Sequence, residues 1–465
     1  MAKTLKQLCE GIIDIQNDAR LEGITTNSKE AKENWLFLAE KEDYIQEALD
    51  HHAYVLSTFI YPHPRHYQVE ELPIDELFQR YYGNFCDDFF VIGITGTNGK
   101  SSVAHYLRQL FEFKKRKVCV IGTDGILIGN QCYPTHNTTP SLMENFHTFQ
   151  RCKRQGIQVI IMEISSHAID QRRIDFIHFD RILYTNIQQD HLDYHHCLTH
   201  YQYTKFKLRN YLKKDGYIIM NNDTSQLSEL LTLTTHHIIT VGRKNAHYHI
   251  GNIQLACDGS SFEFANTAYQ TSCLAEFNVE NIALMLAVGK SLRYSDEELQ
   301  RVVSHLHPLT GRLEVIKQQP CIWIDFAHTP MAIKKVLLFA KRVAQGRVIS
   351  ILGCGGNRDQ DKRGKMGTIA SLYSDIAIFT EDNSRNEKTL DILKAMSVNV
   401  QKNVLWIENR QLAIQKALSL AKENDIILIM GKGNEQFLIA NYGKIPYNDK
   451  AFILSLFEEE TKHEK

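Results

Sequence analysis

The segment Val91-Ile-Gly-Ile-Thr-Gly-Thr-Asn-Gly-Lys-Ser-Ser102 decides the fold of the central part of this chain. A short apolar run, typical of a strand buried on both faces of a parallel sheet, leads into a glycine-rich turn and a helix expected to start around Ser101. Gly96 and Gly99 let the backbone curl so that its N–H groups face an anion, and the helix dipole reinforces that field. Lys100 would reach the β- and γ-phosphates of a nucleotide, and the Ser101 hydroxyl would bind Mg²⁺.

This loop is a shortened variant of the phosphate-binding loop, because the strict pattern has glycine at the position of Ile94. A chance glycine-rich turn is the alternative. Strand, loop, lysine, serine and helix all coincide here, which favours nucleotide binding.

Short apolar runs followed by helical segments continue on the C-terminal side of this loop. They predict an α/β fold with a central, doubly wound parallel sheet and a smaller C-terminal domain of the Rossmann-like type. The first 88 residues mix helical patterns with weak strands, at Trp35–Leu38 and Ala53–Ser57, after a loop at Ile24–Ser28. We expect three domains, at 1–88, 89–313 and 314–465. The predicted strands of the two larger domains are Phe89–Ile94, Lys117–Ile121, Val159–Ile164, Arg181–Tyr184, Tyr217–Met220, Cys321–Phe326, Arg347–Leu352, Ile376–Thr380 and Ile426–Met430.

Composition narrows the class of protein. A chain of 465 residues is too long for one hydrophobic core, and a net charge of -1 creates no general attraction to nucleic acid or membranes. The 10 cysteines include no CxxC pair, which is typical of reduced thiols in a reducing compartment. The sequence shows neither a signal-peptide core nor a stretch of membrane-spanning length. We expect a cytoplasmic protein, and a monomer.

A series of further motifs follows in order between residues 91 and 450. Together with the Gly-Thr-x-Gly-Lys-Ser loop, they resemble the Mur ligase family, and within it the branch that adds the third residue of the stem peptide in peptidoglycan synthesis. The motifs are His136–Pro140, Met162–Ala168, Thr185-Asn186, Asp190–His195, Gly311–Glu314, Asp325–Pro330, Gly353–Gly356, Asp382–Arg385 and Gly431–Glu435.

The resemblance implies ATP and Mg²⁺ around the glycine-rich loop. Glu163 ends one predicted strand and His191 follows another, so both are expected at the carboxyl edge of the sheet, where a carboxylate can bind Mg²⁺. Lys205 matches the lysine that the family carbamylates, which turns a cation into an anion able to hold a second Mg²⁺; Lys207 is the alternative assignment. The expected catalytic residues are Lys100, Glu163, His191, Lys205 and Arg312, and the expected metal ligands are Ser101, Glu163, His191 and carbamylated Lys205. The expected nucleotide contacts are Gly96, Thr97, Asn98, Gly99, Lys100, Ser101, Ser102, Asn281, Arg312, Asp325 and His328.

The resemblance also implies a UDP-MurNAc-dipeptide acceptor and meso-diaminopimelate as the incoming amino acid. Arg385 is the residue that discriminates diaminopimelate from lysine. A guanidinium pairs bidentately with a carboxylate, and lysine lacks the distal carboxylate of diaminopimelate. The expected acceptor contacts are Thr26, Ser28, Asn137, Thr138, Thr139, Ser165, Gln171 and Arg173. The expected amino-acid contacts are Arg358, Asp382, Asn383, Ser384, Arg385, Gly431 and Glu435.

The chain departs from the family pattern in three places. Ser384 stands where proline is usual, which is expected to loosen the turn, and Asn434 replaces the usual histidine. A Gly/Asp/His segment that normally follows the strand at Trp35 is missing, since Ala39 runs directly into Glu40. Either the uridine is held by fewer groups, or the acceptor is not a UDP-sugar peptide.

The expected reaction is ATP-dependent amide-bond formation through an acyl phosphate. Two alternatives stay open. One is a ligase of the same superfamily with another acceptor or amino acid, such as lysine, or of the folylpolyglutamate or cyanophycin type. The other is a non-catalytic nucleotide-binding paralogue.

Overall fold

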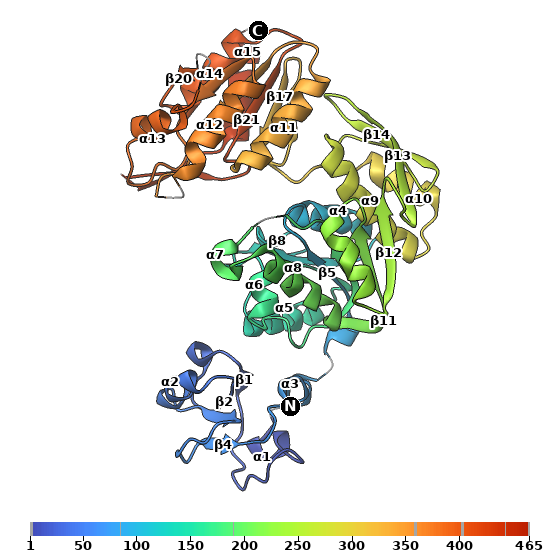
Figure 1. The fold of residues 1–465 in the computed structure, drawn as a ribbon, viewed down its shortest axis with the longest axis vertical. Coiled ribbons are helices and arrows are strands. Elements are labelled where there is room, and N and C mark those ends of the chain that lie inside the picture. Colours follow the sequence, from blue (N-terminus) through green and yellow to red (C-terminus); the bar gives the residue numbers. More distant parts are fainter. Residues whose placement is uncertain are drawn as a thin grey trace. The chain divides into compact units, whose positions relative to one another are not determined.

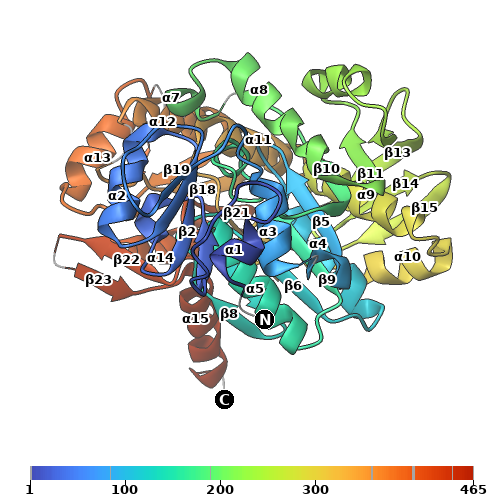
Figure 2. The same cartoon turned by 90° about the horizontal axis from the view of Figure 1, so that it is seen from below.

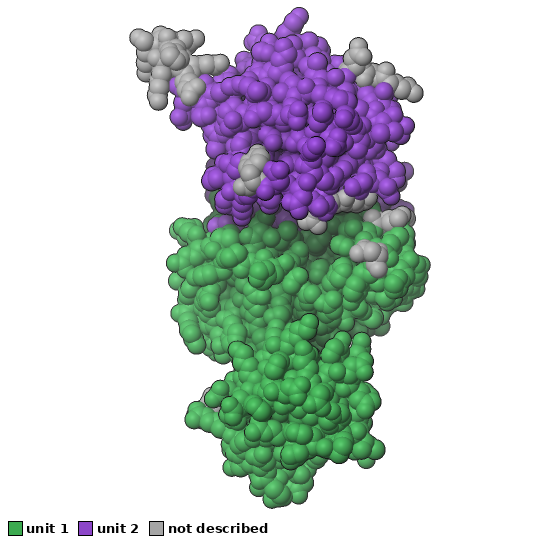
Figure 3. All heavy atoms as spheres, turned by 90° about the vertical axis from the view of Figure 1, so that its left-hand side faces the viewer, with its two compact units in different colours: residues 1–100, 111–220, 226–238 green, residues 101–110, 221–225, 239–465 purple. Residues whose placement is uncertain are grey.

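The computed structural model describes residues 3–83, 85–188, 190–357, 360–400, 404–441 and 443–463. The chain divides into two compact units, coloured separately in Figure 3: residues 1–100, 111–220 and 226–238, and residues 101–110, 221–225 and 239–465. Both units consist of helices packed on largely parallel sheets, so the predicted α/β class is confirmed. No helix in the described part of the chain has the length and apolar character needed to span a bilayer.

The first unit begins with a small parallel sheet of order β1-β2-β3-β4. Neighbouring residues of a strand face opposite sides, so Leu36 and Leu56 join the core formed with α1 and α3, whereas Phe37 and Val55 pack with α2. Figure 2 shows α1 and α2 on the two sides of β2. Both predicted strands are confirmed. The expected loop at 24–28 is partly wrong, because Ile24 pairs with β2 as part of a strand. The elements are α1 (Leu5–Leu8), β1 (Gly23–Thr25), β2 (Trp35–Ala39), α2 (Ile45–Asp50), β3 (Tyr54–Ser57), β4 (His66–Gln68) and α3 (Ile74–Tyr82).

The strands of the first unit's larger sheet follow the order β11-β10-β5-β9-β6-β7-β8. The first five strands are parallel, and β7 and β8 are antiparallel additions. Strand β5 lies between β10 and β9 and runs parallel to both. The glycine-rich loop that follows β5 therefore begins beside the carboxyl ends of these two strands. Phe146 and Phe149 of α5 pack with Val91, Ile160 and Met162 on one face. The elements are β5 (Phe90–Thr95), β6 (Val118–Gly122), β7 (Gly125–Ile128), β8 (Gln131–Tyr133), α5 (Leu142–Arg154), β9 (Val159–Glu163), α6 (Ser166–Asp170), β10 (Phe179–Tyr184), α7 (Leu192–His195), α8 (Leu198–Phe206) and β11 (Leu212–Asn221).

The predicted central strands match the observed ones to within two residues, except β11. That strand begins at Leu212 rather than Tyr217, because Leu212 pairs with Phe179 and the polar residues 213–215 extend the strand before its apolar run. Helix α4 (Lys100–Phe113) begins directly after the glycine-rich loop, as expected.

The second unit carries a sheet of order β16-β17-β21-β18-β19-β20, parallel except for β16. Trp323 and Leu428 face a core with α11, α12 and α13, while Ile322 and Ile427 face a core with α14 and α15. Helices therefore cover both faces (Figure 1), as predicted for a Rossmann-like domain. The elements are β16 (Glu314–Gln318), β17 (Cys321–Asp325), α11 (Pro330–Val343), β18 (Val348–Leu352), α12 (Asp361–Tyr373), β19 (Ile376–Phe379), α13 (Thr389–Met396), β20 (Leu405–Trp406), α14 (Arg410–Leu420), β21 (Ile426–Met430), β22 (Phe437–Ala440), β23 (Gly443–Pro446) and α15 (Asp449–His463).

Sequence reasoning missed the antiparallel meander β13-β14-β15 of the second unit. Its middle strand, Ser260–Phe264, alternates buried and half-buried residues, and this period of two was the available signal. The remaining elements are β12 (His237–Gly242), β13 (Tyr248–Leu255), β14 (Ser260–Phe264), β15 (Thr267–Thr271), α9 (Glu276–Ser291) and α10 (Asp296–Ser304).

Candidate functional site

The glycine-rich loop is held in shape by the segment that follows β10. The backbone N–H of Thr97 donates to the carbonyl oxygen of Asn186 at 2.8 Å, and that of Asn98 donates to Asn186 Oδ1 at 3.0 Å. Thr185 Oγ1 donates to the Asn98 carbonyl at 2.6 Å. Sequence reasoning placed Thr185 and Asn186 in a motif but omitted them from the site residues.

Gly96 and Gly99 are both required by the backbone. Gly96 has a φ of 146° and Gly99 a φ of 87°, a region that side chains rarely adopt. A Cβ atom on Gly96 would lie 2.0 Å from Thr185 Oγ1. The close approach of the loop to residue 185 therefore excludes any side chain at position 96.

Lys205 lies in α8 as expected, and its side chain is buried, with 1% of the residue exposed. Its Nζ donates to the Gly96 carbonyl at 3.0 Å and to Thr95 Oγ1 at 3.3 Å. The Nζ also lies 4.8 Å from the centre of the Tyr201 ring. Lys207, the alternative assignment, is exposed. The structure thus brings Lys205 to the glycine-rich loop.

The environment of Lys205 disfavours the charged form of its amine. Burial is the largest cause that holds the pKa of Lys205 well below its ordinary value, and the charge of Lys100 adds to it, while Asp190 acts in the opposite direction. Lys100 Nζ itself donates to the carbonyls of Gly96 and Thr97, at 3.0 and 3.1 Å. The surroundings of Lys205 therefore favour the uncharged form of its amine more than those of an exposed lysine do.

Glu163 ends β9 and is 3% exposed, at the carboxyl edge of the sheet as expected. Its Oε1 accepts from the Thr123 backbone N–H at 3.2 Å, and its Oε2 accepts from Thr123 Oγ1 at 3.3 Å. Thr138 Oγ1 lies 3.1 Å from Thr123 Oγ1. A Cβ atom on Gly122 would meet Glu163 Oε1 at 2.1 Å, which explains that glycine. Carboxylate and hydroxyl oxygens are ligands that suit Mg²⁺.

His191 precedes α7 in a left-handed conformation with a φ of 51°. Its ring lies 4.9 Å from the ring of His167, and its Nε2 is 3.4 Å from Asp190 Oδ2. Across the described ranges, no three His, Cys, Asp or Glu side chains gather closely enough to hold a metal ion. Mg²⁺ usually keeps waters and phosphate oxygens as ligands, so a sparse protein contribution fits this ion.

Several predicted acceptor contacts assemble around Thr139. Its Oγ1 donates to the Glu163 carbonyl at 2.8 Å and accepts from the Ser165 backbone N–H at 3.0 Å. Arg173 Nη1 donates to the Thr139 carbonyl at 3.0 Å, and its other arm bonds Gln171 Oε1. Asn137 and Thr138 adjoin this group along the chain, and the Asn137 carbonyl accepts from Thr135 Oγ1 at 3.1 Å.

Thr26 and Ser28 belong to the small N-terminal sheet. Thr26 follows β1 and is half-buried. Ser28 is buried, and its hydroxyl donates to Glu47 Oε2. Glu47 lies in α2. The hydroxyl expected to contact the acceptor is therefore engaged by a carboxylate of the protein.

The second unit contains the other predicted nucleotide contacts. Asp325 ends β17, and its carboxylate accepts from the backbone N–H groups of Leu313 and Ala327, each at 2.7 Å. Burial raises the pKa of Asp325, and the nearby Arg312 opposes that effect. The Arg312 guanidinium lies 4.3 Å from the centre of the Phe326 ring. His328 Nδ1 is 2.8 Å from the Phe326 carbonyl oxygen. Asn281 is buried on α9, and Ser101 and Ser102 are half-buried in the first turn of α4.

The predicted amino-acid contacts come together around Asn383. Its Nδ2 donates to Glu435 Oε2 at 2.8 Å, and a Cβ atom on Gly431 would lie 2.9 Å from Asp382 Oδ2. Arg385 has a left-handed φ of 51°, and its Nη1 donates to the Gly356 carbonyl at 2.8 Å. The turn at Ser384, where the family usually has proline, is closed by a 3.0 Å bond from the Glu387 backbone N–H to the Ser384 carbonyl. Arg358 lies outside the described residues. The predicted contacts did not include Lys432, whose Nζ donates to Asn383 Oδ1.

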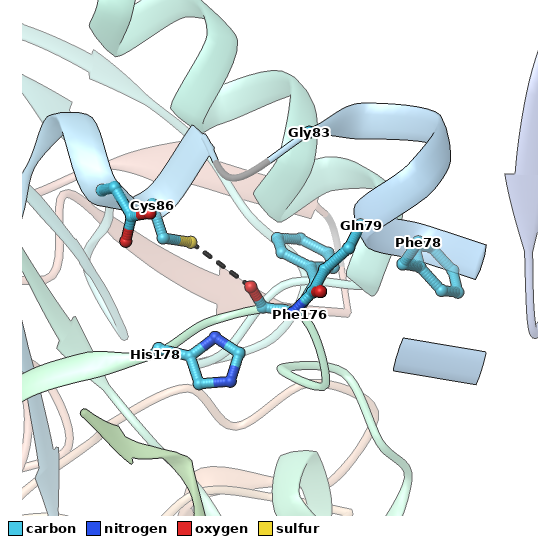
Figure 4. Close-up of a pocket in the computed structure, with 7 residues that line it drawn as sticks. Phe78, Gln79, Gly83, Cys86, Phe176 and His178 are labelled. Atoms are coloured by element: carbon cyan, nitrogen blue, oxygen red, sulfur yellow. Dashed lines mark hydrogen bonds between the residues drawn. The ribbon is translucent and has the colours of Figure 1, made fainter. Parts of the chain in front are cut away.

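A cavity of about 170 Å³ in the first unit contains none of the predicted site residues. It is lined by Phe78, Gln79, Gly83, Cys86, Asp87, Phe176 and His178 (Figure 4). Cys86 Sγ donates to the Phe176 carbonyl at 3.3 Å, and burial raises the pKa of that thiol to about 12. The thiol stays protonated at neutral pH and is poorly reactive.

Comparison with known proteins places the chain beside one group of enzymes. The family descriptions "Mur ligase middle domain" and "Mur ligase, glutamate ligase domain" match residues 94–289 and 311–433. The chain is 33% identical to UDP-N-acetylmuramoyl-L-alanyl-D-glutamate--2,6-diaminopimelate ligase of Oceanobacillus iheyensis, over 89% of this chain and 88% of the relative. It is 32% identical to the ligase of the same name from Aquifex aeolicus, over 93% of each chain.

Solved structures share the fold. One, titled as a UDP-N-acetylmuramoyl-L-alanyl-D-glutamate--2,6-diaminopimelate ligase, matches with a TM-score of 0.75 and 24% identity, over 99% of this chain and 100% of that chain. The MurF ligase of Thermotoga maritima in complex with ADP matches with a TM-score of 0.60 and 17% identity, over 95% and 98%.

Proposed function

Because this chain belongs to the Mur ligase family, we propose that it is an ATP-dependent ligase that adds meso-diaminopimelate to the D-glutamyl carboxylate of UDP-N-acetylmuramoyl-L-alanyl-D-glutamate. The product would be a peptidoglycan precursor made in the cytoplasm by a monomeric enzyme. The observation that carries the choice of amino acid is the loop Asp382–Arg385, which supplies the Arg385 guanidinium and the Asp382 carboxylate. Asn383 of this loop also holds the carboxylate of Glu435. A guanidinium and a carboxylate pair suit the carboxylate and the ammonium of a distal amino-acid centre.

In the proposed reaction, the acceptor carboxylate attacks the γ-phosphorus of ATP, which gives an acyl phosphate and ADP. The amino group of diaminopimelate then attacks the acyl carbon and displaces phosphate, and an amide bond forms. The N-terminus of α4, which begins at Lys100, and the Lys100 ammonium would hold the nucleotide phosphates. Their contribution is mostly positioning and charge stabilisation, as phosphoryl transfer requires.

Mg²⁺, when bound, would neutralise charge on the phosphates and on the acceptor carboxylate. We assign Ser101, Glu163, His191 and carbamylated Lys205 as its protein ligands. The assignment is supported by the oxygen-rich surroundings of Glu163 and by the low pKa of the Lys205 amine. A neutral amine adds CO₂ and releases one proton, leaving an anionic carbamate that can ligate a hard cation.

The remaining residues receive roles by the same reasoning. Asn281, Arg312, Asp325 and His328 would contact the nucleotide. Thr138, Thr139, Ser165, Gln171 and Arg173 would bind the acceptor, with Thr26 and Ser28 on its uridine. The division into domains at 1–88, 89–313 and 314–465 stays part of the proposal.

A ligase with another acceptor is the second candidate, favoured by the bond between Ser28 and Glu47. In that case the N-terminal sheet would bind something other than uridine, while the amide-forming chemistry would be the same.

A panel experiment tests the proposal. Phosphate release is measured with each of several acceptors combined with diaminopimelate, lysine or no amino acid. We expect fast release with the UDP-dipeptide and diaminopimelate, much slower release when L-lysine replaces diaminopimelate, and none without an amino acid. Lys100→Ala, which lacks the ammonium at the phosphates, should release none with any pair. Phosphate release only with an acceptor other than the UDP-dipeptide would establish the second candidate. A folded wild-type protein that releases no phosphate with any pair would be a non-catalytic paralogue.

A further inference from the structure

We propose that Lys432 is a positioning residue that sets the charge of the amino-acid site and thereby selects an amino acid whose far end carries both an ammonium and a carboxylate. The inference rests on the proposed function and concerns the same site. Lys432 would not touch the substrate, because its side chain is fully buried. It would act through Asn383 and Glu435, which are among the proposed substrate contacts.

The contacts of Lys432 are those of an ammonium built into a site. Its Nζ donates to Glu435 Oε2 at 2.8 Å, to Asn383 Oδ1 at 3.2 Å and to the Phe437 carbonyl at 2.8 Å. The Nζ also lies 3.7 Å from Asp382 Oδ1. A buried ammonium is costly unless it is paired and hydrogen-bonded, and these partners satisfy it.

Lys432 and the backbone N–H of Ile439 together determine which way the Asn383 amide points. Asn383 Oδ1 accepts from Lys432 and from the backbone N–H of Ile439, the latter at 2.9 Å. Both neighbours are donors, so the oxygen must face them, and Nδ2 is left to donate to Glu435. The Glu435 side chain is 38% exposed, so this carboxylate is both anchored by the protein and open to a ligand.

Asp382, Lys432 and Glu435 form a charged cluster, and together with Arg385 their charges match a zwitterionic substrate group. Asp382 and Glu435 carry one negative charge each and Lys432 one positive charge, which leaves one negative charge for a substrate ammonium. Arg385 supplies one positive charge for a substrate carboxylate. Loss of Lys432 changes the summed charge of Asp382, Glu435 and residue 432 from minus one to minus two, and this change favours a substrate with a lone distal ammonium, such as lysine.

The ratio of kcat/KM for meso-diaminopimelate to kcat/KM for L-lysine tests this inference. We expect the ratio to fall about tenfold or more in Lys432→Met, with the KM for ATP unchanged within about twofold. The matched control is Lys444→Met on β23, which removes an equal charge from an exposed lysine whose Nζ lies 3.8 Å from the Phe437 ring centre. This control should keep the wild-type ratio. A folded Lys432→Met enzyme with the wild-type ratio overturns the inference.

A second variant covers the case in which Lys432→Met does not fold. Lys432→Met combined with Glu435→Gln makes residues 432 and 435 both neutral. The one negative charge that remains in the cluster is that of Asp382. The inference predicts a ratio closer to wild type in this double variant than in Glu435→Gln alone, and the reverse order contradicts it. Wild-type enzyme that releases no phosphate with diaminopimelate would instead refute the proposed function, so the two failures are distinguishable.

Discussion

Lys100 and Lys205 donate to the same acceptor, since the Nζ atom of each lies 3.0 Å from the carbonyl oxygen of Gly96. Two ammonium groups that share one carbonyl repel each other, and Lys205 is the buried partner. Burial and the charge of Lys100 therefore lower the pKa of Lys205. In the proposed function, Lys100 would hold the phosphates, while the surroundings of Lys205 favour the uncharged form of its amine.

The proposed carbamate on Lys205 can be observed directly. Protein equilibrated with ¹³C-bicarbonate is expected to show a carbamate carbon resonance, and Lys205→Met should lose it, because the buried amine of Lys205 is the proposed nucleophile. Lys207→Met, two residues away and exposed, is the matched control and should keep the resonance. Loss in the control and retention in Lys205→Met would reassign the modification to Lys207.

Gly96→Ala should weaken ATP binding at least about tenfold, because the new Cβ would lie 2.0 Å from Thr185 Oγ1 and displace the loop. Gly129→Ala is the control: it has a positive φ of 59° but no neighbouring atom within 4 Å of the added Cβ. Both variants place a side chain at a positive φ and carry backbone strain, and only the first should change the Kd measured by calorimetry. An unchanged Kd in Gly96→Ala would show that the loop does not hold the nucleotide.

Arg385→Asn should lower kcat/KM for meso-diaminopimelate by about 10- to 100-fold, the equivalent of about 1.5–3 kcal/mol for a charged hydrogen-bonded pair. Asparagine tolerates the left-handed φ of 51° at this position, so the fold should be preserved. Activity with L-lysine, measured in the same assay, should change little. An equal loss with both amino acids would contradict a role in reading the distal carboxylate.

The ion pair between Arg363 and Glu387 should make stability depend on acid pH. The Arg363 guanidinium, 2.8 Å from both carboxylate oxygens, is the main cause that lowers the pKa of Glu387 from 4.5 to about 2, with the backbone N–H of Asn357 second. Because the folded pKa is depressed, the stabilisation is complete above about pH 5 and is lost as the pH falls from 4.5 toward 2.

Urea unfolding checks this dependence. Glu387→Gln should destabilise the protein by about 1–3 kcal/mol at pH 7, since it leaves Arg363 buried without its charge partner, and the difference from wild type should shrink near pH 3. Asp391→Asn removes an exposed pair with Lys394 at 3.5 Å and should cost at most about 0.5 kcal/mol. A difference independent of pH would mean that another interaction accounts for the loss.

Local patterns predicted the strands well where the chain is apolar on both faces. Ile426–Met430 matches β21 at both ends, because continuous burial is visible in the sequence. The meander at Tyr248–Thr271 was missed, since it is half-buried and its alternation is weaker. The polar start of β11 was missed because pairing with Phe179, not residue type, extends that strand.

By itself the sequence determined the strand, glycine-rich turn and helix around Lys100, because those depend on residues that are neighbours in the chain. It also determined the motif that contains Arg385. Only the tertiary structure decided that Lys205 is buried beside Lys100, and that Lys432 lies under Asn383 and Glu435. Desolvation and charge pairing depend on atoms from distant segments, so the protonation of an amine and the charge of a site follow from packing rather than from spacing.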